Sequence, residues 1–89
     1  MTRRRRLHLP DWWFWDIVLS PHVEQRMEER GFTEVDLRAM LQAPLGLEPS
    51  VHDGRFVVRC GHRDRSWAVV VEPWESEHLL VIVTAYQPG

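Results

Sequence analysis

The chain has 89 residues and a mass of 10.6 kDa, which is the size of one small domain. Apolar residues make up 44% of the chain and charged residues 27%, and these shares exclude a disordered or collagen-like protein. The single cysteine excludes both an intramolecular disulfide and a cysteine-based zinc finger.

The net charge of −2 is divided unevenly along the chain. Residues 1–6 contain four arginines and no acid, whereas residues 7–89 contain the other seven arginines and all 13 acids and carry a net charge of −6. Such an acidic body lacks the broad basic surface that binds duplex DNA, so no DNA duplex is expected as a partner. Every cation is an arginine, whose planar guanidinium suits carboxylate and phosphate ligands.

Residues 1–11 are predicted to form a flexible basic arm, and residues 12–89 a single folded domain. Pro10, Asp11 and Asp16 interrupt the apolar residues that follow the arginines, which argues against a signal peptide. No segment has the roughly 18 apolar residues of a membrane span. We therefore expect a cytoplasmic protein with no membrane span.

The aromatic and β-branched run at residues 12–19 predicts a strand. Alternation along that strand would place aromatic rings on both of its faces, and one of those faces needs a partner surface. Trp12, Trp13 and Trp15 are therefore predicted to form an interaction surface, used by a homodimer or a hetero-complex.

A first helix is predicted directly after this run. Ser20 is a candidate N-cap, with Pro21 at the first helical position, where its missing N–H has no cost. The helix is expected to run to about Arg30 and to end at Gly31 in a left-handed conformation.

A second helix is predicted to begin at once. Thr33 and Asp36 fit a capping box, and Phe32 and Leu37 fit the hydrophobic staple that accompanies it. Pro44 is expected to end this helix.

The pattern then changes to that of strands. Residues 55–60 alternate so that Phe56, Val58 and Cys60 share one face, and residues 66–72 and 78–86 are also strand-like. The turn signal Asp53-Gly54 favours a further short hairpin strand at residues 48–52.

Short connections at residues 61–65 and 73–77 predict an antiparallel meander, because parallel strands need a longer crossover. The predicted fold is therefore α+β. An N-terminal strand and two helices are followed by a three- to four-stranded antiparallel sheet, with the helices packed on one face.

One face of the first predicted helix carries a charged stripe. His22, Arg26, Glu29 and Arg30 are spaced so that they fall within about 100° of one another. An imidazole beside guanidiniums can move a proton and hold a phosphate. The alternative is a solvated face, on which Arg26 simply pairs with Glu28 or Glu29.

The segment from Leu19 to Thr33 reads LSPHVEQRMEERGFT and resembles a known family. Its counterpart is the S-x-H-A-x-x-R-M-x-E-R-G-I-S/T opening of small bacterial domains in domain-of-unknown-function family 4258. The resemblance continues through Leu41–Pro44, RFVV at 55–58, VVV at 69–71 and VIVTAY at 81–86, and covers residues 18–88. Val23 departs from the pattern, because alanine is usual there.

Such domains are similar to the RelE, ParE and BrnT toxin group, which shares a helix–helix–sheet layout with metal-independent ribonucleases. The resemblance implies cleavage of RNA, or the same fold without that activity. It also implies RNA as a substrate and an antitoxin as a partner.

Metal-free RNA cleavage uses the 2′-hydroxyl as nucleophile and needs a base, an acid and fixed cations around the phosphorus. His22 fits the base or the acid, and Arg26 and Arg30 fit the cations. Thr84 and Tyr86 share a face of the last predicted strand and are candidates for orienting the substrate, unless they are ordinary strand residues.

Arg59 is a candidate substrate-binding residue on the sheet, and its alternative role is an edge charge. No metal site and no cofactor are expected, since Cys60 and His62 supply only two ligands and the other histidines lack metal spacing. Cys60 is expected to be a small buried hydrophobe.

Two functions therefore remain open. The histidine–arginine stripe and the resemblance favour a metal-independent ribonuclease of the toxin type. The acidic body favours a non-catalytic interaction module of the same fold, dimeric through its aromatic segment.

Overall fold

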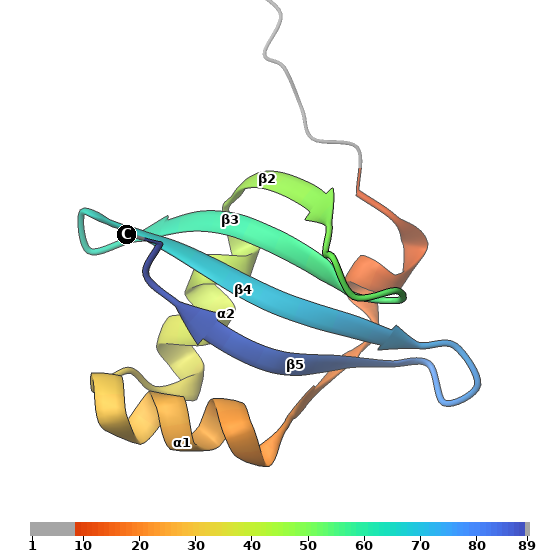
Figure 1. Ribbon diagram of the computed structural model, residues 1–89, viewed down its shortest axis with the longest axis horizontal. Helices are drawn as coiled ribbons and strands as arrows, with labels where there is room; N and C mark the ends of the chain where they lie inside the picture. The colour runs from red at the N-terminus through yellow and green to blue at the C-terminus, as the bar shows by residue number, and fades with distance from the viewer. Residues whose placement is uncertain (1–8, 89) are drawn as a thin grey trace, which may run out of the picture.

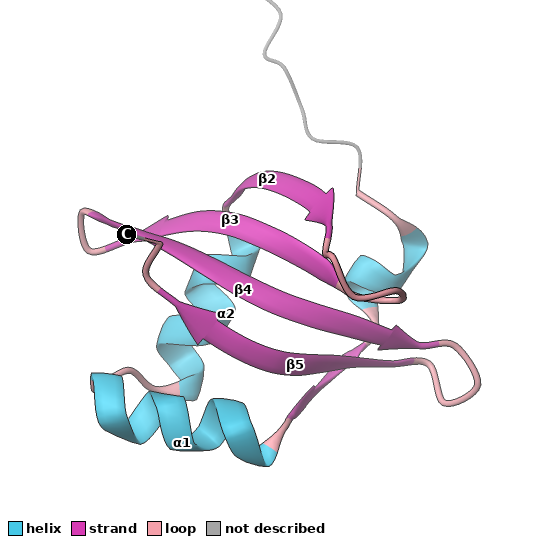
Figure 2. Cartoon of the chain, viewed as in Figure 1, coloured by secondary structure: helices cyan, strands magenta, loops and turns pink. Residues whose placement is uncertain are grey.

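The computed structural model describes residues 9–88, which form an α+β domain with two helices and a five-stranded mixed sheet (Figures 1 and 2). Of the basic arm predicted at residues 1–11, residues 1–8 with all four arginines lie outside the described residues, and Asp11 begins the first element. The strand order across the sheet is β1-β5-β4-β3-β2. In chain order the elements are the 3-10 helix η1 (Asp11–Phe14), β1 (Asp16–Leu19), α1 (Pro21–Arg30), α2 (Glu34–Gln42), β2 (Pro44–Pro49), β3 (Phe56–His62), β4 (Arg65–Trp74) and β5 (Leu79–Tyr86).

The sheet is mixed because β1 and β5, the first and last strands in chain order, lie side by side and run parallel. Asp16–Leu19 pair in register with Leu79–Ile82, whereas all the other neighbouring strands are antiparallel. The predicted three- to four-stranded antiparallel sheet corresponds to β2–β5, but the prediction missed that the N-terminal strand joins this sheet as a fifth, parallel strand. The connection between the two parallel strands contains both helices and three strands, so nothing local in the sequence marks the pairing.

The aromatic run does not form the strand predicted for residues 12–19. Only Asp16–Leu19 form a strand, while Asp11–Phe14 make one 3-10 turn, after which the Trp15 N–H donates to the Trp12 carbonyl at 3.1 Å. The turn directs Trp12, Trp13 and Trp15 against the domain's own core and leaves Phe14 80% exposed. A strand would have left about half of these rings in solvent, which explains why the helical turn is favoured.

Helix α1 begins at a cap that also ties it to the sheet. The Ser20 Oγ accepts from the Val23 N–H at 3.0 Å and donates to the Val83 carbonyl of β5 at 2.8 Å. At the other end Gly31 has φ of 71°, and its N–H donates to the Met27 carbonyl. Both predicted helix signals are confirmed, and α1 has the predicted bounds.

Helix α2 begins with the predicted capping box. The Thr33 Oγ1 accepts from the Asp36 N–H at 3.2 Å, and the Asp36 Oδ2 accepts from the Thr33 N–H at 2.8 Å. Phe32 and Leu37 both lie in the core, as a hydrophobic staple requires. Pro44 follows the helix but also starts β2, so the short strand predicted at residues 48–52 lies earlier in the chain than expected.

Both helices bury their apolar residues against one face of the sheet, and α2 passes behind the sheet in Figure 1. Val23 of α1 is completely buried there, which gives the β-branched side chain at this position a packing role. The core is completed by strand residues that include Val58, Cys60, Val69, Val71, Ile82 and Ala85. Phe56, Val58 and Cys60 therefore share the core face, as predicted.

The opposite side of the sheet, which we call the open face, carries the alternate residues. Arg59, Ala68 and Tyr86 are in register across β3, β4 and β5, and none of them belongs to the core cluster. Val70 and Thr84 form the next row on the same face. Within residues 9–88, no helix is long and apolar enough to cross a membrane.

Candidate functional site

The predicted stripe lies on α1. His22 is exposed in the first turn, Arg26 is partly buried one turn later, and Arg30 is exposed at the end of the helix. Across residues 9–88, none of these three side chains takes part in an ion pair. The pairing of Arg26 with Glu28 or Glu29 that a solvated face predicts is therefore absent from the described structure.

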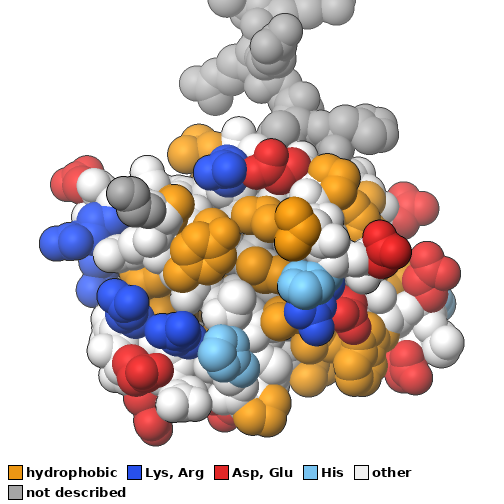
Figure 3. All heavy atoms as spheres, in the orientation of Figure 1, with side chains coloured by type: hydrophobic (Ala, Val, Ile, Leu, Met, Phe, Trp, Pro, Cys, Tyr) orange, Lys and Arg blue, Asp and Glu red, His pale blue; other side chains and the backbone are white. Residues whose placement is uncertain are grey.

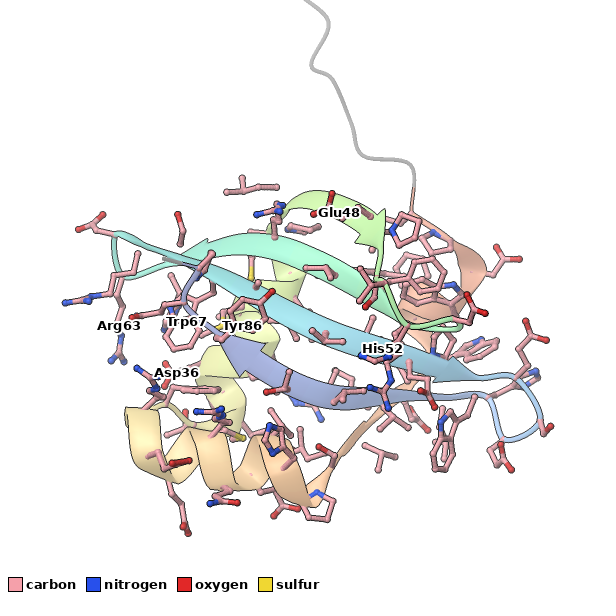
Figure 4. The ribbon with its side chains drawn as sticks, in the orientation of Figure 1. Asp36, Glu48, His52, Arg63, Trp67 and Tyr86 are labelled. Atoms are coloured by element: carbon pink, nitrogen blue, oxygen red, sulfur yellow. The ribbon has the colours of Figure 1, made fainter. Side chains whose placement is uncertain are left out.

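Helix α1 runs along the C-terminal half of β5, to which Ser20 bonds and against which the helix packs (Figure 1). That half of β5 carries Thr84 and Tyr86 on the open face. Tyr86 is 42% exposed and lies across β4 (Figure 4), where its register partner Ala68 is buried. The fold thus brings α1 beside the strand that carries these two candidates, although the helix covers the opposite face of the sheet from the one that carries Thr84 and Tyr86.

Arg59 also lies on the open face, but one strand separates it from Tyr86. Its guanidinium is engaged by Glu48 of β2, whose Oε1 lies 2.8 Å from both Nε and Nη2. This geometry favours the edge-charge interpretation of Arg59, because its donors already have a carboxylate partner.

The predicted interaction surface has a different character from the one expected. Trp12, Trp13 and Trp15 are partly buried within their own domain, and the Trp12 ring lies 5.0 Å from that of Phe56. The side chain that this segment leaves exposed is Phe14. A partner that binds to this segment would therefore contact Phe14 rather than the tryptophans.

A polar network connects the start of α2 with the end of β3 and the β3–β4 turn, and its partners lie far apart in the sequence. The Asp36 Oδ1 lies 3.0 Å from the His62 Nε2 and 3.2 Å from the Arg63 Nη2. The Asp36 Oδ2 accepts from the N–H and the hydroxyl of Thr33 at 2.8 and 3.1 Å. Both oxygens of this carboxylate, which is only 8% exposed, are therefore satisfied.

These contacts stabilise the charged form of Asp36. The hydrogen bond from the Thr33 backbone N–H, together with those from the Thr33 hydroxyl and His62 and the charge of Arg63, lowers the pKa of Asp36. Burial opposes this effect without reversing it. Asp36 consequently carries its negative charge throughout the neutral range.

Replacing Asp36 by asparagine should lower the Tm at neutral pH by roughly 5 °C, since an amide cannot accept from Thr33, His62 and Arg63 together. Folding lowers the pKa of Asp36, so its contribution to stability is present above the unfolded pKa of about 3.9 and is lost as the pH falls through the folded value. The Tm difference between the two proteins should therefore shrink below about pH 4. Thermal melts followed by circular dichroism across this range test the prediction, and a difference independent of pH would contradict it.

His62 was missed because residues 61–65 look like one polar turn. In the structure β3 continues through His62, and the turn contains only Arg63 and Asp64. The available signal was the alternation of Phe56, Val58 and Cys60, which, continued by two residues, places His62 on the face that the helices cover.

A cleft of about 370 Å³ opens beside this network. Arg30 at the end of α1 lines it together with Arg63 of the β3–β4 turn and Arg65, the first residue of β4. Phe32 and Trp67, whose rings are 5.0 Å apart, are buried beneath. Figure 3 shows arginine side chains gathered at this end of the molecule, and Figure 4 places Asp36, Arg63 and Trp67 there.

Cys60 is the small buried residue that was expected. It is 1% exposed, and burial raises the pKa of its thiol to about 11. A thiol of that pKa stays protonated at neutral pH and is a poor nucleophile. Over residues 9–88, no three histidine, cysteine or acidic side chains are grouped so that they would hold a metal ion.

Comparison with known proteins identifies one family. The family model described as "Domain of unknown function (DUF4258)" matches residues 19–87, a span that contains both helices, β2 to β5 and every residue of the stripe and the cleft. No curated protein and no solved structure matches the chain. Because the model covers far more than half of the sequence, the chain belongs to the family of domains of unknown function DUF4258.

Proposed function

We propose that this domain binds single-stranded RNA along α1 and the adjacent half of β5 and cleaves it without a metal ion. His22 and Arg26 supply the reactive groups, Arg30 holds a neighbouring phosphate of the strand, and Thr84 and Tyr86 orient it. By this proposal, the domain acts as a ribonuclease of the type found among the RelE, ParE and BrnT toxins.

One observation carries the proposal: the arginines without a carboxylate partner gather in one region. Of the seven arginines within residues 9–88, four are paired, namely Arg38 with Glu34, Arg55 with Glu72, Arg59 with Glu48 and Arg63 with Asp36. The remaining three, Arg26, Arg30 and Arg65, lie on α1 and at the turn beside its end. Guanidiniums left open on an otherwise acidic body favour an anionic ligand, and phosphate matches their fork geometry.

The chemical step uses the side chains on α1 together with a water molecule. His22 takes the proton from a 2′-hydroxyl, and the 2′-oxygen forms a bond to the adjacent phosphorus. The bond from phosphorus to the 5′-oxygen breaks, and that oxygen takes a proton from water. The products are a 2′,3′-cyclic phosphate and a 5′-hydroxyl, while Arg26 stabilises the additional negative charge of the transition state.

The purified protein should therefore cleave single-stranded RNA in the presence of a metal chelator and leave 2′,3′-cyclic phosphate ends. Free RNA and ribosome-bound RNA are both tested, and the ends are identified by their resistance to phosphatase before acid treatment. Failure to cleave either substrate, together with no growth arrest on expression, would contradict the proposal.

The second candidate is a non-catalytic module that binds a second copy of itself. Phe14 is 80% exposed, and an apolar groove of about 480 Å³ near the same segment is lined by Pro10, Trp12, Leu47 and Phe56. An exposed phenylalanine near such a groove is typical of an interface.

In this second case, sedimentation at micromolar concentration should give the mass of a dimer, and Phe14→Ala should shift it towards a monomer by about tenfold in Kd. Val51→Ala is the control, since Val51 is 97% exposed on the β2–β3 loop. A monomeric wild type would exclude the homodimer.

A further inference from the structure

We propose that the cleft between the end of α1 and the β3–β4 turn is a binding site for the phosphate of a phosphate ester. Arg30, Arg63 and Arg65 are the residues that would hold it. In bound RNA the ligand would be a phosphate other than the scissile one, and this part of the inference rests on the proposed function. The phosphate site itself does not require that the domain cleave anything.

Two elements far apart in the sequence direct arginines into this cleft. Arg30 follows the buried Val23 by seven residues, which is two helical turns, so both side chains point to the side of α1 that faces the sheet. Val23 lies within the core, whereas Arg30 lies beyond its edge and lines the cleft. Arg65 begins β4 opposite His62, and Arg63 stands in the turn between them.

The guanidiniums in the cleft have donors to spare. Within residues 9–88, Arg30 and Arg65 have no carboxylate partner. Arg63 contacts Asp36 through one nitrogen, at 3.2 Å, and its side chain is 73% exposed. Since a guanidinium has five N–H donors, most of those on Arg63 remain available to a ligand. Asp36 does not compete for the other arginines, because its oxygens are already satisfied.

The backbone of the turn holds Arg63 in an unfavourable conformation. Arg63 has φ of 52° and Asp64 has φ of 62°, which is the left-handed region. Two-residue turns of this kind favour Asn-Gly, which adopts positive φ at little cost. Arginine is not a residue that this turn geometry favours, so its presence here is in keeping with a role for its side chain at the cleft.

Two features of the cleft oppose an anion, and they sharpen the test. Glu29 lines the cleft with a carboxylate, and the last carbonyls of α1 carry a partial negative charge. The Asp36 carboxylate already offsets part of the charge of Arg63, yet the three guanidiniums together still outweigh the Glu29 and Asp36 carboxylates and this partial charge. It follows that removing the charge of Glu29 should tighten binding, whereas removing an arginine should weaken it.

The volume of the cleft favours a phosphate that carries an attached group. About 370 Å³ is near the lower end of the range of roughly 300–1,000 Å³ typical of small-molecule sites. A phosphate ester with part of its sugar is therefore a better match than a bare phosphate ion. Terminal and internal phosphates of RNA share this chemistry, so the experiment must separate them.

The test is an NMR titration that follows the Nε–H signals of the arginine side chains at constant ionic strength, with chloride as the reference salt. The probes are inorganic phosphate, a 2′-O-methyl RNA hexamer with hydroxyl ends, and the same hexamer with a 5′-phosphate. A 2′-O-methyl group blocks the nucleophile, so binding is measured where no cleavage can occur. We expect the Nε–H signals of Arg30, Arg63 and Arg65 to shift in a saturable way when either hexamer is added.

The variants separate the cleft from the general charge of the protein. Arg65→Ala should weaken binding by about tenfold, and Glu29→Gln should strengthen it by roughly threefold. Arg38→Ala is the matched control, because it removes the same charge from an exposed residue that pairs with Glu34 on α2; it should change binding by less than about twofold. Arg30→Ala provides a second test should Arg65→Ala alter the turn, which a thermal melt reveals.

The hexamer with hydroxyl ends should bind in a manner that depends on Arg65, which assigns the site to an internal phosphate. Binding of inorganic phosphate and the 5′-phosphorylated hexamer alone would assign it to a terminal phosphate and would overturn the internal position. Absence of saturable shifts with every probe, or equal losses in Arg65→Ala and Arg38→Ala, would overturn the phosphate site. Binding without cleavage of ordinary RNA would leave this site standing while the proposed function fails.

Discussion

Replacing Leu37 by alanine is expected to lower the free energy of unfolding by about 2–5 kcal/mol. Leu37 is fully buried in α2, where it packs in the core formed by both helices and the sheet. The substitution removes buried apolar surface and leaves a cavity, while leucine and alanine differ little in helix propensity. In a domain of this size, the loss corresponds to a fall in Tm of at least roughly 8 °C.

Leu45→Ala provides the matched control for this effect. Leu45 is 73% exposed on β2, so the same chemical change should alter stability by less than about 0.5 kcal/mol. Urea denaturation followed by circular dichroism measures both variants, with the slope of the transition as a check on two-state unfolding. Similar losses in the two variants would contradict the packing of α2 against the sheet.

The helices could be predicted because their signals are local. Ser20 and Thr33 each bond a backbone N–H three residues later, and Gly31 adopts its left-handed conformation directly after α1. Each of these interactions depends on neighbours within four residues, so the amino-acid types alone indicate them. The strands β3, β4 and β5 were recognisable for a similar reason, since alternation is a local property.

The position of β1 could not be predicted in the same way. The four residues of β1, Asp16–Leu19, pair with β5, which begins some sixty positions later. No turn or short connection in the sequence indicates this pairing. The aromatic residues before them favour a strand by residue type, and yet here they pack on the core from a 3-10 turn. Tertiary burial decided the conformation of this segment.

The candidate site was predictable only where it lies on one helix. The spacing of His22, Arg26 and Arg30 places them on α1 without any knowledge of the sheet. The cleft joins Arg30 to Arg65, and the network joins Asp36 to His62, 26 residues away. Such partners come together only through the three-dimensional fold, and no local pattern of residues links them.

Replacing His22 by alanine is expected to slow RNA cleavage by about 10²–10⁴-fold, which is the usual contribution of a general acid or base. The side chain is exposed on α1, and the residues through which this helix packs are Val23 and Met27. The Tm should therefore change by no more than a few degrees. The measurement is the rate of cleavage of single-stranded RNA at saturating substrate, with circular dichroism as the control for folding.

Two further variants decide what that loss means. His52→Ala removes an exposed imidazole from the β2–β3 loop and should leave the rate unchanged, which controls for a general effect of losing a histidine. Arg26→Lys keeps the positive charge and loses the bidentate fork, so it should slow cleavage by roughly tenfold. If His22→Ala retained the wild-type rate, the stripe on α1 would not be the catalytic site. The same would follow if Arg26→Lys cleaved at the wild-type rate while His52→Ala was slower. A loss of activity in His22→Ala with unchanged binding of the 2′-O-methyl hexamer would place the effect in the chemical step, because the phosphate cleft at the other end of α1 would still hold the strand.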